Sequence, residues 1–204
     1  ADLTEADIII TNDVARLEKI KLLGLLSKIN SPELDKRVSK EYRDETGLWY
    51  GLSLRARVII YNTQLVNKDD LSGYYALANS KWKDSILIRS SSNVYNQSLI
   101  AAMILNYGKE ETSLFLKSFV SNFARSPSGG DRDQIKAVAS GEGKIAIVNS
   151  YYYLKMLEDT KNNLVNTNIH FPFDDKMGTH TNISGAGIIT HSDNKKNAQI
   201  FLEF

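Results

Sequence analysis

The sequence predicts an α/β fold in which helices flank sheets that are rich in parallel strands. Short apolar runs with β-branched residues alternate along the chain with segments whose apolar residues recur every three or four positions. This alternation is typical of sheets covered by helices on both faces. Apolar residues make up 42% of the 204 residues and charged residues 24%, a balance that indicates a packed globular fold.

The first elements are expected to be a strand, a helix and a second, longer strand. Residues 7–11 form an apolar run that predicts a buried strand. A helix should follow over residues 13–26, capped by Asn12 or Asp13, because its apolar side chains share one face. Residues 55–61 are rich in residue types that favour strands.

The middle of the chain predicts one short strand and three helices. Residues 86–88 form a buried strand that leads into a polar loop. That loop opens a helix over 95–106, and another helix runs over 109–123. A turn at 127–130 precedes a helix over 131–139, which we expect Asp131 to cap and two glycines to end.

The last third of the chain repeats the alternation of strand and helix. A strand over 144–149 leads directly into a helix over 151–159, and an asparagine-rich loop follows. The remaining elements are a short strand at 169–171, a glycine-broken strand over 183–190 and a helix from about residue 194. Because the chain opens on a buried strand and stops in a helix without a cap, we expect it to be part of a longer protein.

The composition narrows the range of functions. The net charge of +1 gives no basis for a nucleic-acid partner. The absence of cysteine excludes disulfides, thiolate catalysis and cysteine-based metal sites. The three histidines, His170, His180 and His191, do not have the spacing of metal ligands. No apolar run approaches the roughly 20 residues that cross a membrane.

Three consecutive tyrosines, Tyr151, Tyr152 and Tyr153, stand where a predicted strand gives way to a helix. The carboxyl ends of such strands face the crevice in which open α/β sheets bind ligands. Buried phenols need a hydrogen-bond partner or a ligand, and a cation that prefers hard oxygen donors would supply one. Consecutive tyrosines are also common as core or surface residues. A helix directs at most two of them into one cleft, and we expect Tyr153 to be structural.

Two further groups of side chains could bind an anion. Ser90, Ser91 and Ser92 form a hydroxyl-rich loop before a helix, which suits either an anion or simple capping of the helix. Arg55 and Arg57 alternate on a strand and therefore point to the same face. A guanidinium there suits a planar oxyanion or a surface ion pair.

Six segments in a fixed order carry a resemblance to a known family. They are WYGLSLRARV (49–58), RSSSNVYNQSL (89–99), NFAR (122–125), GGDRDQIKAVA (129–139), IVNSYY (147–152) and THTNISGAG (179–187). Together they resemble the periplasmic ferric-iron-binding proteins of ABC importers, the Fbp/Fut type, which have the class II periplasmic-binding-protein fold.

The resemblance implies a set of site residues. In that family a tyrosine from a loop and an adjacent tyrosine pair hold Fe³⁺, and these correspond to Tyr95, Tyr151 and Tyr152. Arg55 and Lys155 match basic residues that approach the iron. The remaining coordination positions would be filled by a ligand near the N-terminus of the whole protein, by water, or by a carbonate-like anion near Arg55 and the serine loop.

The resemblance also implies two lobes with the iron in the cleft between them. Lobe I would comprise residues 1–57 and 182–204 and would be partial, whereas lobe II, residues 58–181, would be nearly complete. The connecting strands would lie at about 55–62 and 181–189.

The function expected from the resemblance is carriage of ferric iron without enzymatic turnover. A monomeric, exported or periplasmic protein would deliver the ion to the permease of an ABC transporter in the membrane. Two alternatives remain open from the residues themselves. One is a binding protein for another solute, such as an anion or a polyamine, and the other is a periplasmic-fold enzyme that uses Tyr95 and Tyr151.

Overall fold

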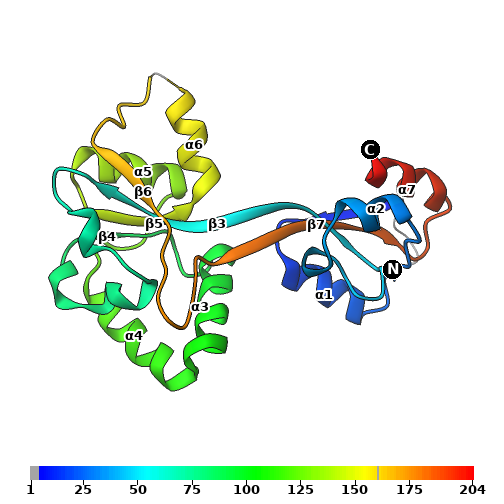
Figure 1. The fold of residues 1–204 in the computed structure, drawn as a ribbon, viewed down its shortest axis with the longest axis horizontal. Coiled ribbons are helices and arrows are strands. Elements are labelled where there is room, and N and C mark those ends of the chain that lie inside the picture. The colour runs from blue at the N-terminus through cyan, green and yellow to red at the C-terminus, as the bar shows by residue number, and fades with distance from the viewer. Residues whose placement is uncertain (1–4, 160) are drawn as a thin grey trace. The chain divides into compact units, whose positions relative to one another are not determined.

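The computed structural model describes all residues except 1–4 and 160, and these residues form two compact units (Figure 1). Unit 1 contains the described residues up to Arg55 together with Asn182–Phe204. Unit 2 contains Ala56–Thr181. No helix in the described part of the chain is both long and apolar enough to cross a membrane.

The chain passes between the two units twice. It enters unit 2 along β3 (Tyr50–Asn62) and returns to unit 1 at the start of β7 (Thr181–Ile189). The resemblance predicted two lobes, one of residues 1–57 with 182–204 and one of residues 58–181. This division stays a proposal, because it concerns the lobes of the whole protein and includes residues that the structure does not describe.

Unit 1 is built around β7, which pairs antiparallel with β1 and β2 and lies beside β3. Glycines on β7 allow this close packing. A Cβ at Gly185 would stand 2.7 Å from the carbonyl oxygen of Tyr50, and one at Gly187 would stand 2.8 Å from that of Leu48. The other elements of the unit are β1 (Ile8–Thr11), α1 (Val14–Leu22), β2 (Leu26–Ser27), α2 (Pro32–Arg37), the 3-10 helix η1 (Lys40–Tyr42) and α7 (Lys195–Glu203).

Unit 2 contains a mixed sheet with helices on both faces. Strand β3 pairs antiparallel with β5 and with β6, and β4 pairs in parallel with β5. Its strands are β4 (Ile86–Leu87), β5 (Ile145–Asn149) and β6 (Thr167–His170), besides most of β3. Its α-helices are α3 (Val94–Tyr107), α4 (Lys109–Ser121), α5 (Asp131–Ser140) and α6 (Ser150–Glu158).

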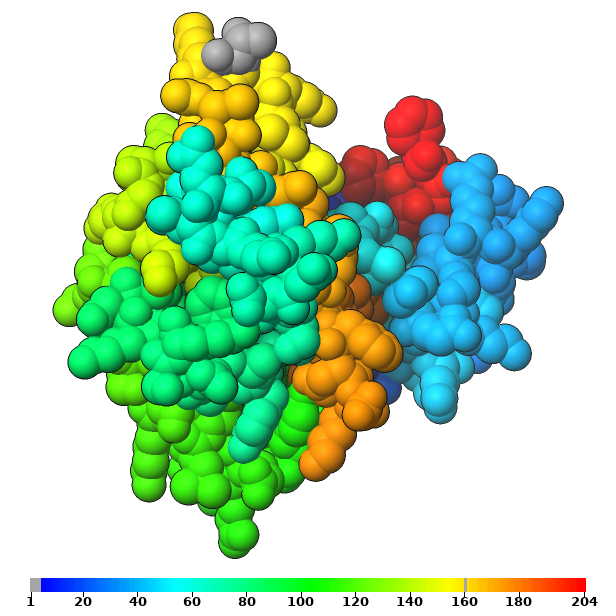
Figure 2. Space-filling model, turned by 60° about the vertical axis from the view of Figure 1, so that its left-hand side comes forward, coloured from blue at the N-terminus to red at the C-terminus, as the bar shows by residue number. Residues whose placement is uncertain are grey.

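Three 3-10 helices connect β3 to β4: η2 (Lys68–Asp70), η3 (Tyr74–Ala78) and η4 (Ser80–Trp82). Figure 2 shows this connection, in cyan to blue-green, on the surface of unit 2. Helix η3 packs against α4. The buried side chains of Tyr74, Leu77 and Trp82 anchor this connection, because they are part of the hydrophobic core beneath it.

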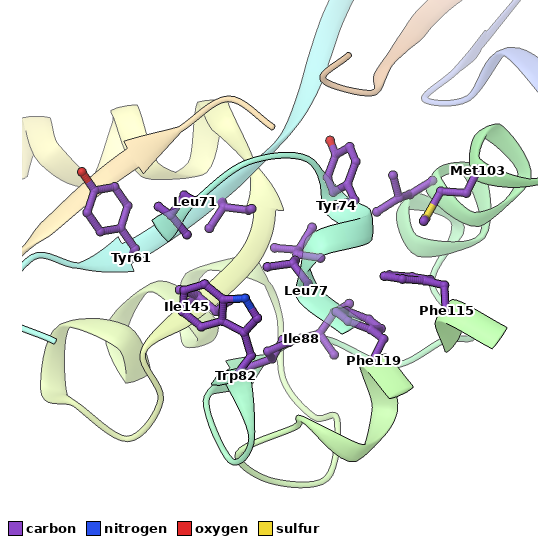
Figure 3. Packing of buried hydrophobic residues seen from close by; sticks show 14 of the residues in the cluster. Tyr61, Leu71, Tyr74, Leu77, Trp82, Ile88, Met103, Phe115, Phe119 and Ile145 are labelled. Carbon is purple, nitrogen blue, oxygen red and sulfur yellow. The ribbon is translucent and has the colours of Figure 1, made fainter. Parts of the chain in front are cut away.

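The core of unit 2 lies on both faces of β5, which is buried along its whole length. Ile145 and Ile147 join a cluster formed with α3, α4 and the η3 segment, which Figure 3 shows. Ala146 and Val148 point the other way and join a cluster formed with α5 and α6. Successive residues of a strand face opposite sides, so this one apolar run contacts both helical layers.

The predicted α/β class is confirmed, but the pairing differs from the expected parallel-rich sheet. Among the described pairs only β4 and β5 run parallel. The first predicted helix was too long, because it ends at Leu22 and the backbone turns at Gly24, whose φ is +69°. Helix α2 was not predicted, although Ser31 caps it and Pro32 opens it.

Replacing Leu77 by alanine should lower the free energy of unfolding by about 2–5 kcal/mol, because the side chain is 1% exposed and its loss leaves a cavity. Urea unfolding followed by circular dichroism measures this change. The same substitution at Leu105, which is 87% exposed on α3, should change stability by less than about 0.5 kcal/mol. Equal losses for the two variants would contradict the described core.

Candidate metal centre

The three candidate tyrosines all lie in unit 2, in the first turns of two helices. Tyr95 is the second residue of α3, and the side chain of Asn93 caps this helix by accepting the N–H of Tyr95 at 3.0 Å. Tyr151 and Tyr152 follow Ser150 in α6, directly after β5. Because β4 and β5 are parallel neighbours, their carboxyl ends share one edge of the sheet, and the helices that follow them begin there.

The phenol of Tyr151 contacts the other two. Its side chain hydrogen-bonds to those of Tyr152 and Tyr95, and the rings of Tyr151 and Tyr152 lie 4.2 Å apart at an angle of 32°. Burial of the phenol, followed by these hydrogen bonds, raises the pKa of Tyr151. Each of the three tyrosines is half-buried. The structure therefore brings the three predicted ligands together.

An ion-pair network of two arginines and one carboxylate packs against the ring of Tyr95. The guanidinium of Arg57, which is 2% exposed, donates to one oxygen of Asp131 at 3.0 Å. Arg89 donates to the other oxygen of Asp131 at 3.2 Å. The guanidinium carbons of Arg57 and Arg89 lie 5.9 Å and 5.5 Å from the centre of the Tyr95 ring. Burial lowers the pKa of Arg57, and the charge of Asp131 opposes that shift.

Hydrogen bonds tie this network to the backbone around the tyrosines. The N–H of Asn149, the last residue of β5, donates to Asp131 at 2.7 Å. The amide of Asn96 accepts from Arg57 at 2.7 Å and donates to the carbonyl oxygens of Arg89 and Ser90. The start of α3, the loop before it and the end of β5 are thus fixed to one carboxylate.

Three arginines place positive charge close to the rings of Tyr95 and Tyr152. Arg57 and Arg89 face one side of Tyr95, and the guanidinium carbon of Arg132 lies 5.7 Å from the ring centre of Tyr152. These positive charges favour an anion close to the tyrosine rings. In the described part of the chain, no group of three or more His, Asp or Glu side chains is placed to hold a metal ion.

Tyr153 points away from the other tyrosines into the core. It is 3% exposed, and its hydroxyl donates to the carbonyl oxygen of Thr167 at 3.0 Å. Its predicted structural role is confirmed. Lys155, the predicted basic residue on the same helix, is exposed to solvent, and its approach to a metal stays a prediction.

The other predicted anion ligands have partners of their own in the structure. Ser90, Ser91 and Ser92 are exposed, and the hydroxyls of Ser90 and Ser92 lie 2.9 Å apart within their own loop. Arg55 belongs to unit 1, where it donates to the side chain of Ser184 and to the carbonyl oxygen of Asn12. Its role beside iron stays a prediction.

Two interpretations of the sequence were wrong at this site. Arg57 forms a buried ion pair and not a surface one. Asp131 does not cap α5, because Gly130 occupies the cap position and its N–H donates to Asp133 at 2.7 Å. No pattern in the sequence separates Asp131 from Asp133, because both carboxylates lie in the first turn of one helix.

Residues 4–204 match the family of bacterial extracellular solute-binding proteins. The chain belongs to this family. It is 42% identical over 203 residues to iron uptake protein A1 of Synechocystis sp. (strain ATCC 27184 / PCC 6803 / Kazusa). The aligned region covers 98% of this chain and 56% of that protein. It is also 27% identical over 157 residues to the major ferric iron-binding protein of Neisseria meningitidis serogroup B. That aligned region covers 76% of this chain and 46% of that protein.

Solved structures have the same fold. The Trichodesmium FutA protein in complex with iron and citrate superposes with a TM-score of 0.91 at 43% identity, over 98% of this chain and 65% of that one. The ferric iron-binding protein A of Mannheimia haemolytica in an open conformation gives a TM-score of 0.89 at 42% identity, over 100% of this chain and 65% of that one. The predicted family and fold are confirmed, and the chain spans only part of the length of its relatives.

Replacing Asp131 by asparagine should lower the free energy of unfolding by about 3–5 kcal/mol, because the buried guanidinium of Arg57 and the partly exposed one of Arg89 would lose their shared counter-charge. Urea unfolding measures the loss. The matched control is Asp133→Asn on the same helix turn, where the exposed side chain serves only as a cap and the cost should be about 1 kcal/mol or less. Similar costs at the two positions would show that the network does not stabilise unit 2.

Proposed function

We propose that this chain is the part of an iron-carrying solute-binding protein that holds Fe³⁺ through the phenolate oxygens of Tyr95, Tyr151 and Tyr152. The observation that carries the proposal is the hydrogen-bonded contact of Tyr151 with both other phenols on one edge of unit 2. The names of the relatives, which describe iron uptake and ferric iron binding, support the choice of cargo.

The chemistry of the donors fits a ferric ion. Fe³⁺ is small, hard and highly charged, and it prefers anionic oxygen to imidazole or thioether. Three phenolates would balance its charge. A phenol is a poor ligand until a bound cation lowers its pKa, as a metal does for water. The arginines near Tyr95 and Tyr152 add positive charge around the site, which favours an anion beside the iron.

The remaining coordination positions would be filled from elsewhere. Water, a carbonate-like anion, or a ligand from the part of the whole protein that this chain does not span could complete the shell. Citrate is a further candidate, because a related protein is described with iron and citrate. Arg55, Lys155 and the loop of Ser90, Ser91 and Ser92 are the basic and hydroxyl groups that we propose for such an anion.

In the whole protein the role would be carriage without chemical turnover. The protein would be exported, would act as a monomer and would pass the ion to the permease of an ABC transporter. Membership of the extracellular solute-binding family supports this role, because such proteins bind a solute and release it unchanged.

Adding Fe³⁺ should produce a visible absorption band from charge transfer between phenolate and iron. Tyr151→Phe and Tyr152→Phe should each weaken the band and lower iron affinity by more than about 100-fold, since the loss of a ligand exceeds the 10–100-fold effect of an outer-shell change. A spectrophotometric titration against a competing chelator measures both quantities.

The control for these variants is Tyr153→Phe, which removes a neighbouring hydroxyl that bonds to Thr167. It should cost about 1 kcal/mol of stability and leave the band unchanged. The proposal fails if ferric iron leaves the spectrum of the unaltered protein unchanged, or if all three variants weaken the band equally.

Iron affinity should fall as the pH falls. Burial and hydrogen bonding raise the pKa of Tyr151, so the phenol is protonated at neutral pH and must release its proton when iron binds. Lowering the pH supplies that proton and favours the iron-free form. Titrations from pH 8 to pH 6 should show affinity lost by roughly a factor of ten per pH unit for each proton released. A proton release of zero, measured with an indicator dye in weak buffer, would contradict phenolate ligation.

A further inference from the structure

The hydroxyl of Tyr74 lies where the chain enters and leaves unit 2. Arg57 is the second residue of this unit, and His180 is the last but one. The Tyr74 hydroxyl donates to the carbonyl oxygen of Arg57 and accepts the N–H of His180 at 3.0 Å. The N–H of Arg57 in turn donates to the carbonyl oxygen of His180 at 2.8 Å. One phenol therefore completes a closed ring of hydrogen bonds between the entering segment and the leaving segment.

Burial holds this phenol in place. Tyr74 is 0% exposed, and its ring belongs to the hydrophobic core of unit 2. Figure 3 shows the ring among apolar side chains, with the hydroxyl pointing out of the cluster. Burial also raises the pKa of Tyr74, so the hydroxyl keeps its proton and stays a donor to Arg57. Removal of the hydroxyl would leave two backbone groups without this partner, which is costly in a buried place.

His180 connects this ring of hydrogen bonds to α3. The Nε2 atom of His180 and the hydroxyl oxygen of Ser98 share a hydrogen bond at 2.9 Å. Ser98 follows Tyr95 by three positions on α3, so the two side chains lie on the same side of the helix, about one turn apart. The imidazole therefore holds α3 one turn away from a proposed iron ligand.

Arg57 holds the same helix at a second point. Its guanidinium donates to the side chain of Asn96, the residue after Tyr95, at 2.7 Å. The side chains of Arg57 and His180 thus contact α3 on either side of Tyr95 in the sequence, and Tyr74 joins the backbones of the same two residues. The position of Tyr95 depends on both segments by which the chain crosses the boundary of unit 2.

We propose that Tyr74 and His180 are positioning residues of the tyrosine site, which couple the entering and leaving segments to Tyr95. The coupling path is the series of hydrogen bonds from Arg57 through Tyr74 and His180 to Ser98. A shift of either segment changes these bonds, moves the first turns of α3 and alters the geometry that Tyr95 offers to a ligand. Where it concerns iron, this inference rests on the proposed function, so its first test uses no metal.

The metal-free test is NMR of the full chain with ¹³C at the Cζ atom of every tyrosine. Tyr74→Phe removes the hydroxyl and keeps the ring, so it should shift the Tyr95 signal, which Tyr95→Phe identifies by its loss. The amide of His180 should exchange with solvent about tenfold faster or more, because it loses its acceptor. The matched control is Tyr61→Phe on β3, a buried tyrosine of the same core cluster, which should change neither readout.

An unshifted Tyr95 signal in Tyr74→Phe would overturn the proposal, and so would equal effects of the two phenylalanine substitutions. A general loss of stability does not produce the expected result, because it would raise the exchange of amides throughout unit 2 and not that of His180 in particular.

The coupling to iron is measured by the decay of the charge-transfer band after a strong chelator is added. Tyr74→Phe and Ser98→Ala should each speed iron release about fivefold, the effect of one lost hydrogen bond, and should leave one iron bound per chain. The double variant should release iron no faster than the faster single variant, because both substitutions interrupt the same path at His180. Tyr61→Phe should release iron at the rate of the unaltered chain.

Unchanged release in Tyr74→Phe, or additive effects in the double variant, would overturn the coupling to iron. A missing band in the unaltered chain would instead contradict the proposed function, and the metal-free NMR would still decide whether Tyr74 positions Tyr95.

Discussion

The buried carboxylate of Asp131 is the interaction on which the arrangement of unit 2 depends. One oxygen accepts from Arg57 on β3 and from the backbone of Asn149 at the end of β5, and the other accepts from Arg89 after β4. A carboxylate with no exposed surface is costly to bury, and two guanidinium groups and a backbone N–H offset that cost. Three strands and the start of α5 are therefore fixed relative to one another by a single charged group.

The tyrosine cluster follows from the same arrangement. The parallel pairing of β4 and β5 brings the starts of α3 and α6 to one edge of the sheet, so that residues 56 positions apart in the sequence meet there. Asn96, in the first turn of α3, accepts a hydrogen bond from Arg57. Asn149, the residue before α6, donates its backbone N–H to Asp131. The three tyrosines stand in the first turns of α3 and α6, beside this charged network, which limits how far each phenol can move.

Much of this arrangement could be predicted from the sequence, but its polar core could not. Apolar runs and helix signals predicted α3 to α6, and the position of Tyr151 and Tyr152 after a strand predicted the edge of the sheet at which they lie. Sheet direction was harder, because an alternation of strand and helix does not show that β3 runs against β5. Asp131 and Arg57 look like surface residues, and only their distance in space reveals the pair, since 74 positions separate them in the chain.

The double passage of the chain between the units has a consequence for the order of folding during synthesis. Unit 2 is one continuous segment, so all of its described residues have been made once residue 181 has left the ribosome. Unit 1 is different, because β7 lies between β1 and β3 and is made after all of unit 2. Strand β1 must therefore wait, with its apolar side chains unpaired, until more than 170 later residues have been made, as the positions of Thr11 and Gly185 show. Among the strands that the structure describes, β1 is made first and is among the last to reach its native partner, which leaves it open to wrong contacts in the meantime.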